Sequence, residues 1–126
     1  MNIASELQRA ARSAAETLHG LSGVVAVVVA SADGFDIASS TSGGIDAARV
    51  AAMASSISAI GSVAAQEGRL SRCRQVTVGT DDGFVYVSAV SRNDGEFVIN
   101  VIADNRAILA QVAYSTAEQV RALEAA

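Results

Sequence analysis

The sequence predicts an α+β protein with a five-stranded antiparallel sheet and three helices. Amphipathic segments with helical periodicity stand at the start, in the middle and at the end of the chain, and β-branched segments lie between them. Two turn signals, Asp82-Gly83 and Asn93-Asp94-Gly95, join neighbouring segments as hairpins, so these strands run antiparallel. The 126 residues suffice for one hydrophobic core, and we expect one domain over residues 1–126.

The first helix is expected from Asn2 to His19. Gly20 follows at the position where a helix C-cap glycine is common. The apolar side chains of this segment share one helical face: Ile3, Leu7, Ala11, Ala14 and Leu18.

The next two elements are expected to be strands. Val24–Ala30 is an unbroken apolar run, which is typical of a strand covered on both faces and therefore central in its sheet. Asp33-Gly34 is a hairpin turn signal, and Phe35–Ser39 is the predicted returning strand.

A second helix is expected from Asp46, a preferred N-cap residue, to Glu67 or Gly68. Three strands are predicted after it: Cys73–Thr80, Phe84–Val90 and Phe97–Ala103. The last of these is again almost entirely apolar, so it pairs most simply with Val24–Ala30 in the middle of the sheet. The predicted spatial order of the strands is second, first, fifth, fourth, third.

The last helix is expected to start near Asp104 or Asn105. Its apolar side chains recur at helical spacing: Ile108, Leu109, Val112, Ala113, Val120 and Leu123. The order of elements is therefore helix, strand, strand, helix, strand, strand, strand, helix.

The composition argues against several classes of function. The chain contains no Lys, which removes the lysine of a P-loop, of a Schiff base and of a lysine general base. One Cys and one His do not supply the ligands of a zinc site. A net charge of −4 and a pI near 4.8 argue against a nucleic-acid partner, which usually meets a basic stripe. We expect an interaction module with no catalytic residue, metal or cofactor.

Single residues that suggest chemistry have simpler explanations. His19 would have to join a Ser and an Asp in a hydrolase triad, but the sequence has no Gly-x-Ser-x-Gly elbow. Cys73 is expected to be a small, half-buried hydrophobic residue. Asp81, Asp82 and Asp94 lie in predicted turns, where Asp bonds its own backbone.

No targeting or membrane segment is evident. The N-terminal segment mixes charged and apolar residues and has no signal-peptide core. The long uncharged stretch Val50–Gln66 is interrupted by Ser and Gly, and a membrane span needs about 20 predominantly apolar residues. A single free thiol fits a reducing compartment, so we expect a cytoplasmic protein without a membrane partner.

The second helix is expected to mediate a homodimer. Its larger apolar residues form one stripe suited to packing on the sheet: Val50, Met53, Ile57, Ile60 and Ala64. Small residues form a second stripe that allows another helix to approach closely: Ala47, Ala51, Ala54, Ser55, Ser58, Ser62 and Ala65. An alanine-rich composition would produce the same stripe without a dimer, since Ala is the best helix former.

The strand Cys73–Thr80 is predicted at an open edge of the sheet, next to this helix. An open edge is managed by charge, by cover or by pairing with another chain. Val76 and Val78 are therefore added to the predicted dimer interface. Four arginines flank the helix and the strand: Arg49, Arg69, Arg72 and Arg74. They are candidate contacts to an acidic partner surface, and the alternative is a solvated rim around the interface.

The chain resembles the Roadblock family, named for the dynein light chain, which includes the bacterial gliding-motility partner of a Ras-like GTPase. The similarity rests on the ordered set of Leu21-Ser22-Gly23-Val24, the segment Asp33–Ser39, the Ala-rich helix Ala47–Ala65 and the strand pair around Asp82-Gly83. It extends from Ser5 to Leu123, although no single motif in it is diagnostic.

The resemblance implies a profilin-like fold, a homodimer through the second helix and the third strand, and a role as regulator or scaffold of small GTPases. Some relatives stimulate GTP hydrolysis by remodelling the GTPase's own loops, without an arginine finger. Relatives often begin the last helix with Asn, a bulky apolar residue and Gly, whereas this chain has Asn105-Arg106-Ala107. The resemblance therefore does not predict the same close packing at this helix start.

Three functions are compared. The first is a dimeric GTPase regulator or scaffold. The second is a small-molecule-binding sensory domain, which would need a pocket between the sheet and the helices, where the Ala and Val residues instead indicate a filled core. The third is a hydrolase that depends on His19, for which the sequence offers the least support.

Overall fold

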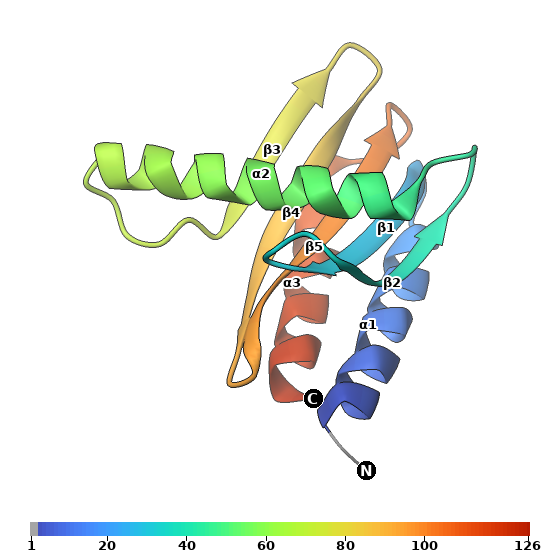
Figure 1. Ribbon diagram of the computed structural model, residues 1–126. Coiled ribbons are helices and arrows are strands. Elements are labelled where there is room, and N and C mark those ends of the chain that lie inside the picture. Colours follow the sequence, from blue (N-terminus) through green and yellow to red (C-terminus); the bar gives the residue numbers. More distant parts are fainter. Residues whose placement is uncertain (1–2) are drawn as a thin grey trace.

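The computed structural model describes residues 3–126, with the elements arranged as in Figure 1. In chain order they are α1 (Ile3–His19), β1 (Val24–Ser31), β2 (Asp36–Thr41), α2 (Ala47–Glu67), β3 (Gln75–Thr80), β4 (Gly83–Arg92), β5 (Gly95–Asp104) and α3 (Leu109–Ala125). Asn2, where we expected the first helix to begin, and the side chain of Ile3 lie outside the described part.

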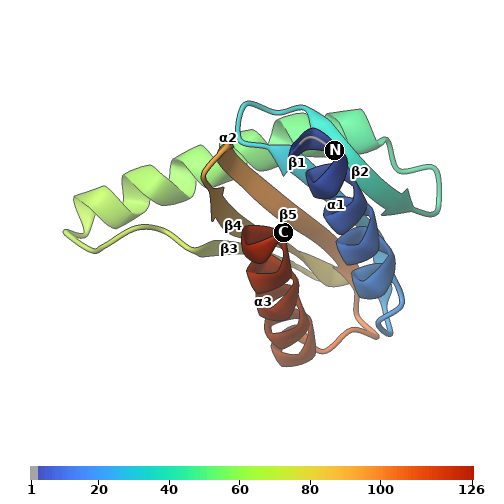
Figure 2. The ribbon, with the colours of Figure 1, turned by 90° about the horizontal axis from the view of Figure 1, so that it is seen from below.

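The strands form one antiparallel sheet in the order β2-β1-β5-β4-β3, which confirms the predicted α+β fold and strand order. Six of the eight residues of β1 and six of the ten residues of β5 are buried, as expected for the two central strands. α1 and α3 cover one face of the sheet and α2 crosses the other, as Figure 2 shows. β1 and β5 are therefore covered on both faces.

Each face of the sheet has its own core. On one face Val27, Ile99 and Val101 pack against Leu18 of α1 and Val112 of α3. On the other, smaller face, strand residues pack under α2: Val28, Ala30, Val87 and Val98. The alternation of side chains along each strand sends neighbouring residues to opposite cores.

The helix α3 begins at Leu109, so the prediction of a start near Asp104 or Asn105 was wrong. The Asp104 side chain accepts a hydrogen bond from the Arg106 N–H at 2.9 Å, and its carbonyl accepts one from the Ala107 N–H at 3.1 Å. These bonds close a turn in place of the first helical turn. Asp is as favourable in such a turn as at a helix N-cap, so the sequence does not separate the two.

The helix α2 is longer than the width of sheet that it covers. Its C-terminal half and the loop that follows project past β3 at the edge of the molecule (Figure 1). The helix ends at Glu67, as predicted, and β3 begins at Gln75 rather than at Cys73. Because the projecting turns have no sheet beneath them, their side chains are exposed on most sides.

Candidate interaction surface

Two members of the predicted small-residue stripe of α2 face the sheet, not the solvent. Ala51 and Ala54 are fully buried against β1, β4 and β5 within the protomer, beside Val50. Their predicted place on an outward dimer face was therefore wrong. Small residues let the helix approach the sheet closely, and that close approach explains the stripe that the sequence shows.

Of the larger apolar residues of α2, Val50 and Ile57 pack on the sheet as predicted, whereas others face outward. Met53 is 44%, Ile60 68% and Val63 57% exposed, and Leu70 in the following loop is 73% exposed. Met53 and Ile60, which we expected to pack on the sheet, are thus solvent-facing. Of the predicted small-residue contacts, Ala47, Ser55, Ser58 and Ala65 are half-buried and Ser62 is exposed.

Phe35 extends this apolar surface from the β1–β2 turn. The turn packs on α2, since the Ser55 hydroxyl donates to the Ala32 carbonyl at 2.6 Å and Gly34 lies against Ala52. The Phe35 side chain is 69% exposed. Phe35 was predicted to begin a strand, but β2 begins at Asp36, so Phe35 belongs to the turn that Asp33-Gly34 signals.

The open edge of the sheet lies beside α2. β3 pairs only with β4, and five of its six residues are exposed. Val76 is half-buried because it lies directly under Gly61 of α2, whereas Val78 is 39% exposed. We call the exposed side chains of Phe35, Met53, Ile60, Val63 and Leu70, together with the β3 edge, the α2–β3 surface.

A groove of about 450 Å³ opens where the end of α2 projects past β3. It lies between Ala64 and Ala65 of the helix and the segment from Leu70 to Val76. Its walls are mainly apolar side chains and helix backbone. The overhanging helix, the groove and the open edge thus adjoin one another, and Arg72 and Arg74 are the charged residues that line the groove.

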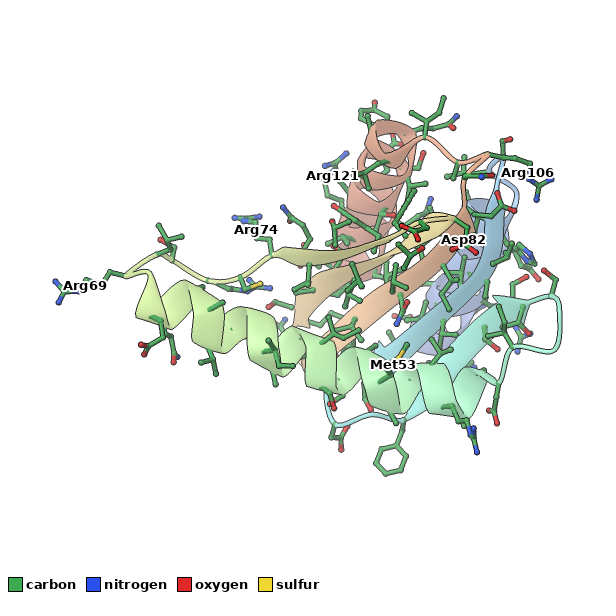
Figure 3. All side chains as sticks on the ribbon, turned by 90° about the horizontal axis from the view of Figure 1, so that it is seen from above. Met53, Arg69, Arg74, Asp82, Arg106 and Arg121 are labelled. Atoms are coloured by element: carbon green, nitrogen blue, oxygen red, sulfur yellow. The ribbon has the colours of Figure 1, made fainter. Side chains whose placement is uncertain are left out.

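The four predicted partner-contact arginines do not form one cluster. Arg49 is in the first turn of α2, whereas Arg69, Arg72 and Arg74 follow the other end of this helix, about 30 Å away along its axis. Arg121 of α3, which the sequence analysis did not single out, lies with Arg72 and Arg74 around one cavity. Figure 3 shows Arg74 and Arg121 on the side of the sheet opposite α2.

Among the described residues, His19 and Ser40 form the contact that most resembles a catalytic pair. The His19 Nδ1 and the Ser40 Oγ lie 2.6 Å apart, which ties the end of α1 to β2. No carboxylate of residues 3–126 bonds the imidazole, so the third member of a triad is absent from the described part of the chain. Over the same residues, no three His, Cys, Asp or Glu side chains gather in a way that would hold a metal ion.

The helix α2 is long and apolar enough to match a membrane span by composition. It has 21 residues and a window of mean hydropathy 1.3. The same helix packs along the sheet through Val50, Ala51 and Ala54, so one of its sides is already covered by protein. Its exposed apolar residues therefore form a stripe on a surface helix.

Comparison with known proteins gives a consistent family. A model of the Roadblock/LC7 domain matches residues 14–103. A Roadblock/LC7 domain from Streptomyces avermitilis has a similar structure, with a TM-score of 0.79 and 24% identity over 89% of this chain and 92% of that one. No curated protein sequence matches the chain.

Two structures of MglB are similar at lower identity. MglB from Myxococcus xanthus has a TM-score of 0.77 and 16% identity, over 98% of this chain and 89% of that one. A structure described as MglB with tetrameric arrangement has a TM-score of 0.82 and 16% identity, over 98% and 90%. At these identities the similarity establishes the fold.

Proposed function

The chain belongs to the Roadblock/LC7 family, and from this premise we propose that it is a cytoplasmic homodimer that regulates or scaffolds a small Ras-like GTPase. The observation that carries the proposal is the α2–β3 surface, where exposed apolar side chains adjoin an open sheet edge. The proposed role is non-catalytic: the protein binds its partner and does not itself supply the reacting groups.

A second copy of the chain is the partner that covers both parts of this surface. A two-fold axis beside β3 pairs the two edges and brings the outer faces of the two α2 helices together. Such an interface buries Met53, Ile60 and Val63, each of which is otherwise exposed to water. The proposed dimer contacts are therefore the exposed larger apolar residues of α2, in place of the small residues that were expected from the sequence.

The dimer is tested by measuring mass in solution against protein concentration, with light scattering after gel filtration. Ile60→Glu places a charge at the centre of the proposed interface and is expected to weaken association about thirtyfold or more. Ile108→Glu is the matched control, because Ile108 is 64% exposed against 68% for Ile60 but precedes α3. A monomeric wild type, or equal effects of the two variants, would contradict the dimer.

The GTPase partner is supported by family membership and by the fold shared with MglB. The experiment is single-turnover GTP hydrolysis by each small Ras-like GTPase encoded in the same genome, with and without the protein. Acceleration identifies an activator, and binding without acceleration identifies a scaffold. Absence of both with every such GTPase contradicts the proposal.

The mode of activation is tested with arginine variants. We propose that no arginine finger acts in trans, so Arg49→Ala, Arg72→Ala and Arg74→Ala each retain acceleration within about tenfold. Loss of a finger costs about 10³-fold or more. A loss of that size in any one variant, with binding intact, would show a direct charge role.

A further inference from the structure

Between α3 and the sheet edge lies a second cavity, of about 350 Å³, which shares Arg72, Arg74 and Gln75 with the groove beside α2. Its floor is made by β4, one wall by α3 and the rim by the segment that leads into β3. It opens on the sheet face opposite α2, the side on which Figure 3 shows Arg74 and Arg121. A volume of this size is at the lower end of small-ligand pockets.

Three arginines line this cavity, in a chain whose net charge is −4: Arg72, Arg74 and Arg121. In the part of the chain that the structure describes, the ion pairs are Arg92–Asp94 and Arg106–Asp104, so none of the three is neutralised by a carboxylate. All three side chains are exposed, so their mutual repulsion is screened by water, and an anion bound between them would lower it further.

The acidic residue that lines this cavity already accepts a hydrogen bond from the backbone. Glu124 lines the cavity, but its Oε2 accepts a hydrogen bond from the Ser91 N–H at 3.0 Å. This bond fixes its carboxylate at the end of α3. Three cations and one anion line the cavity, which therefore keeps a positive excess.

The floor of the cavity carries polar groups that are almost completely buried. Tyr86 is 8% and Ser88 is 9% exposed, and Gln75 lies opposite Ser88 in the β3–β4 ladder. Burial raises the pKa of the Tyr86 hydroxyl, so it stays protonated at neutral pH and can donate a hydrogen bond. Ala117 and Val120 of α3 supply an apolar wall.

We propose that this cavity binds the phosphate group of a small phosphorylated metabolite. Guanidinium groups match phosphate oxygens in bidentate geometry, and hydroxyl donors on the floor suit the remaining oxygens. The apolar wall of Ala117 and Val120 contacts the organic part of such a ligand. The site differs from the GTPase proposal in its ligand and lies on the α3 side of the sheet, although Arg72 and Arg74 also line the groove beside α2.

The test is thermal unfolding and calorimetric titration of the full chain with inorganic pyrophosphate and with AMP, at constant ionic strength. Both probes are expected to raise the Tm. The double variant Arg74→Gln with Arg121→Gln is expected to weaken pyrophosphate binding about tenfold or more, since hydrogen bonds to charged groups are lost. Arg12→Gln, which removes an exposed arginine of α1, is the control and should leave binding unchanged.

A second variant separates a pocket from general attraction to arginine. Ala117→Leu keeps all three arginines but narrows the cavity at its apolar wall, so it should weaken AMP binding about tenfold or more while pyrophosphate still binds. Full AMP binding by this variant, or an equal loss in Arg12→Gln, would overturn the proposal. So would binding of a polyglutamate peptide when neither phosphate probe binds.

The arginines have one other candidate partner, the acidic turn Asp81-Asp82 of a second copy paired along β3. In that case the double arginine variant weakens self-association and the phosphate probes have no effect on the Tm. This result would also overturn the proposed site. It would leave the homodimer proposal in place, so the two can be told apart.

Discussion

Gly23 and Ala107 lie in direct contact where the chain enters β1 and where it leaves β5. A Cβ built on Gly23 would come within 2.2 Å of the Ala107 backbone nitrogen and 2.8 Å of its Cβ. The Gly23 carbonyl also accepts a hydrogen bond from the Asp104 N–H at 2.8 Å. The segment before α3 therefore packs closely although it carries Ala at position 107, because the glycine that permits the approach is at position 23.

Gly23→Ala is expected to destabilise the fold by about 3–5 kcal/mol. The new methyl meets backbone atoms that cannot rotate away, and the φ of +83° is unfavourable for a residue with a Cβ. Urea unfolding at a fixed protein concentration measures the effect.

Gly43→Ala is the matched control for this variant. Gly43 has a similar φ of +68°, but no atom lies within 4 Å of a Cβ built on it. It should cost only the left-handed backbone strain, about 1–2 kcal/mol. Equal losses in the two variants would show that the contact with Ala107 contributes nothing.

This contact separates the features that local sequence patterns predict from those that they do not. The turn glycine, the apolar run of β1 and the hairpins could be predicted because each depends on residues adjacent in the chain. The contact of Gly23 with Ala107 joins positions far apart in sequence, and no local pattern specifies it. The same holds for the start of α3, where Asp104 closes a turn that competes with a helix cap.

Gly61→Ala tests the close packing of α2 on β3. A Cβ at position 61 would lie 2.5 Å from Val76 Cγ2 and 2.8 Å from Cys73 Sγ. Ala improves the helix propensity by about 1 kcal/mol, but overpacking costs about 1–3 kcal/mol, so we expect a small net loss of stability. Thermal unfolding and urea titration measure it.

The partner variant Val76→Ala removes Val76 Cγ2, the nearer of the two atoms that would lie too close to a Cβ at position 61. The double variant is therefore expected to be more stable than the sum of the single effects predicts, by about 1 kcal/mol. Strict additivity would mean that α2 does not rest on β3 at this point. All variants must be compared at one protein concentration, because self-association also shifts apparent stability.

The α2 surface shows a second limit of the sequence. Both stripes of the helix could be predicted from its periodicity, but the face that packs on the sheet takes residues from each, Val50 and Ile57 from one and Ala51 and Ala54 from the other. Apolar size favours burial of Met53 and Ile60, whereas the sheet beneath α2 requires small side chains such as Ala51 and Ala54. The cavity beside α3 was also not predicted, because Arg121 meets Arg72 and Arg74 only in the folded chain.

Asn100→Val is expected to raise stability by about 1–2 kcal/mol. Asn100 is fully buried on β5, between Val28 of β1 and Val87 of β4, and neither its Oδ1 nor its Nδ2 has a hydrogen-bond partner. A buried polar group without a partner costs about 1–3 kcal/mol, and Val fits both the strand and its neighbours. Thermal unfolding measures the gain.

Thr116→Val in α3 repeats this test at a second site. The Thr116 hydroxyl is also buried without a partner, and Val has nearly the same shape. A gain is expected here too, since Thr and Val are both β-branched and have similar helix propensities. A loss of stability in Asn100→Val would mean that its carboxamide is satisfied in solution.

Stability in acid is expected to depend on Arg92 and Asp94 in the β4–β5 turn. The Arg92 guanidinium donates to the Asp94 carboxylate at 2.8 Å, and it also bonds the Leu123 and Ala126 carbonyls at the end of α3. The hydrogen bond from Arg92 lowers the pKa of Asp94 below its ordinary value of 3.8. A folded pKa below the unfolded one means that ionised Asp94 stabilises the fold.

This contribution is therefore complete above the unfolded pKa and is lost as the pH falls below about 4 toward the lower folded pKa. Asp94→Asn should flatten the decline of the unfolding free energy between neutral and acid pH, measured by urea titration at several pH values. Asp104→Asn should act in the same direction, since Arg106 lowers the pKa of that carboxyl. Asp33→Asn, in the β1–β2 turn, serves as the control. An acid slope that is identical in wild type and Asp94→Asn would mean that the ion pair does not hold the turn to the end of α3, and Arg92 would then act on the α3 carbonyls alone.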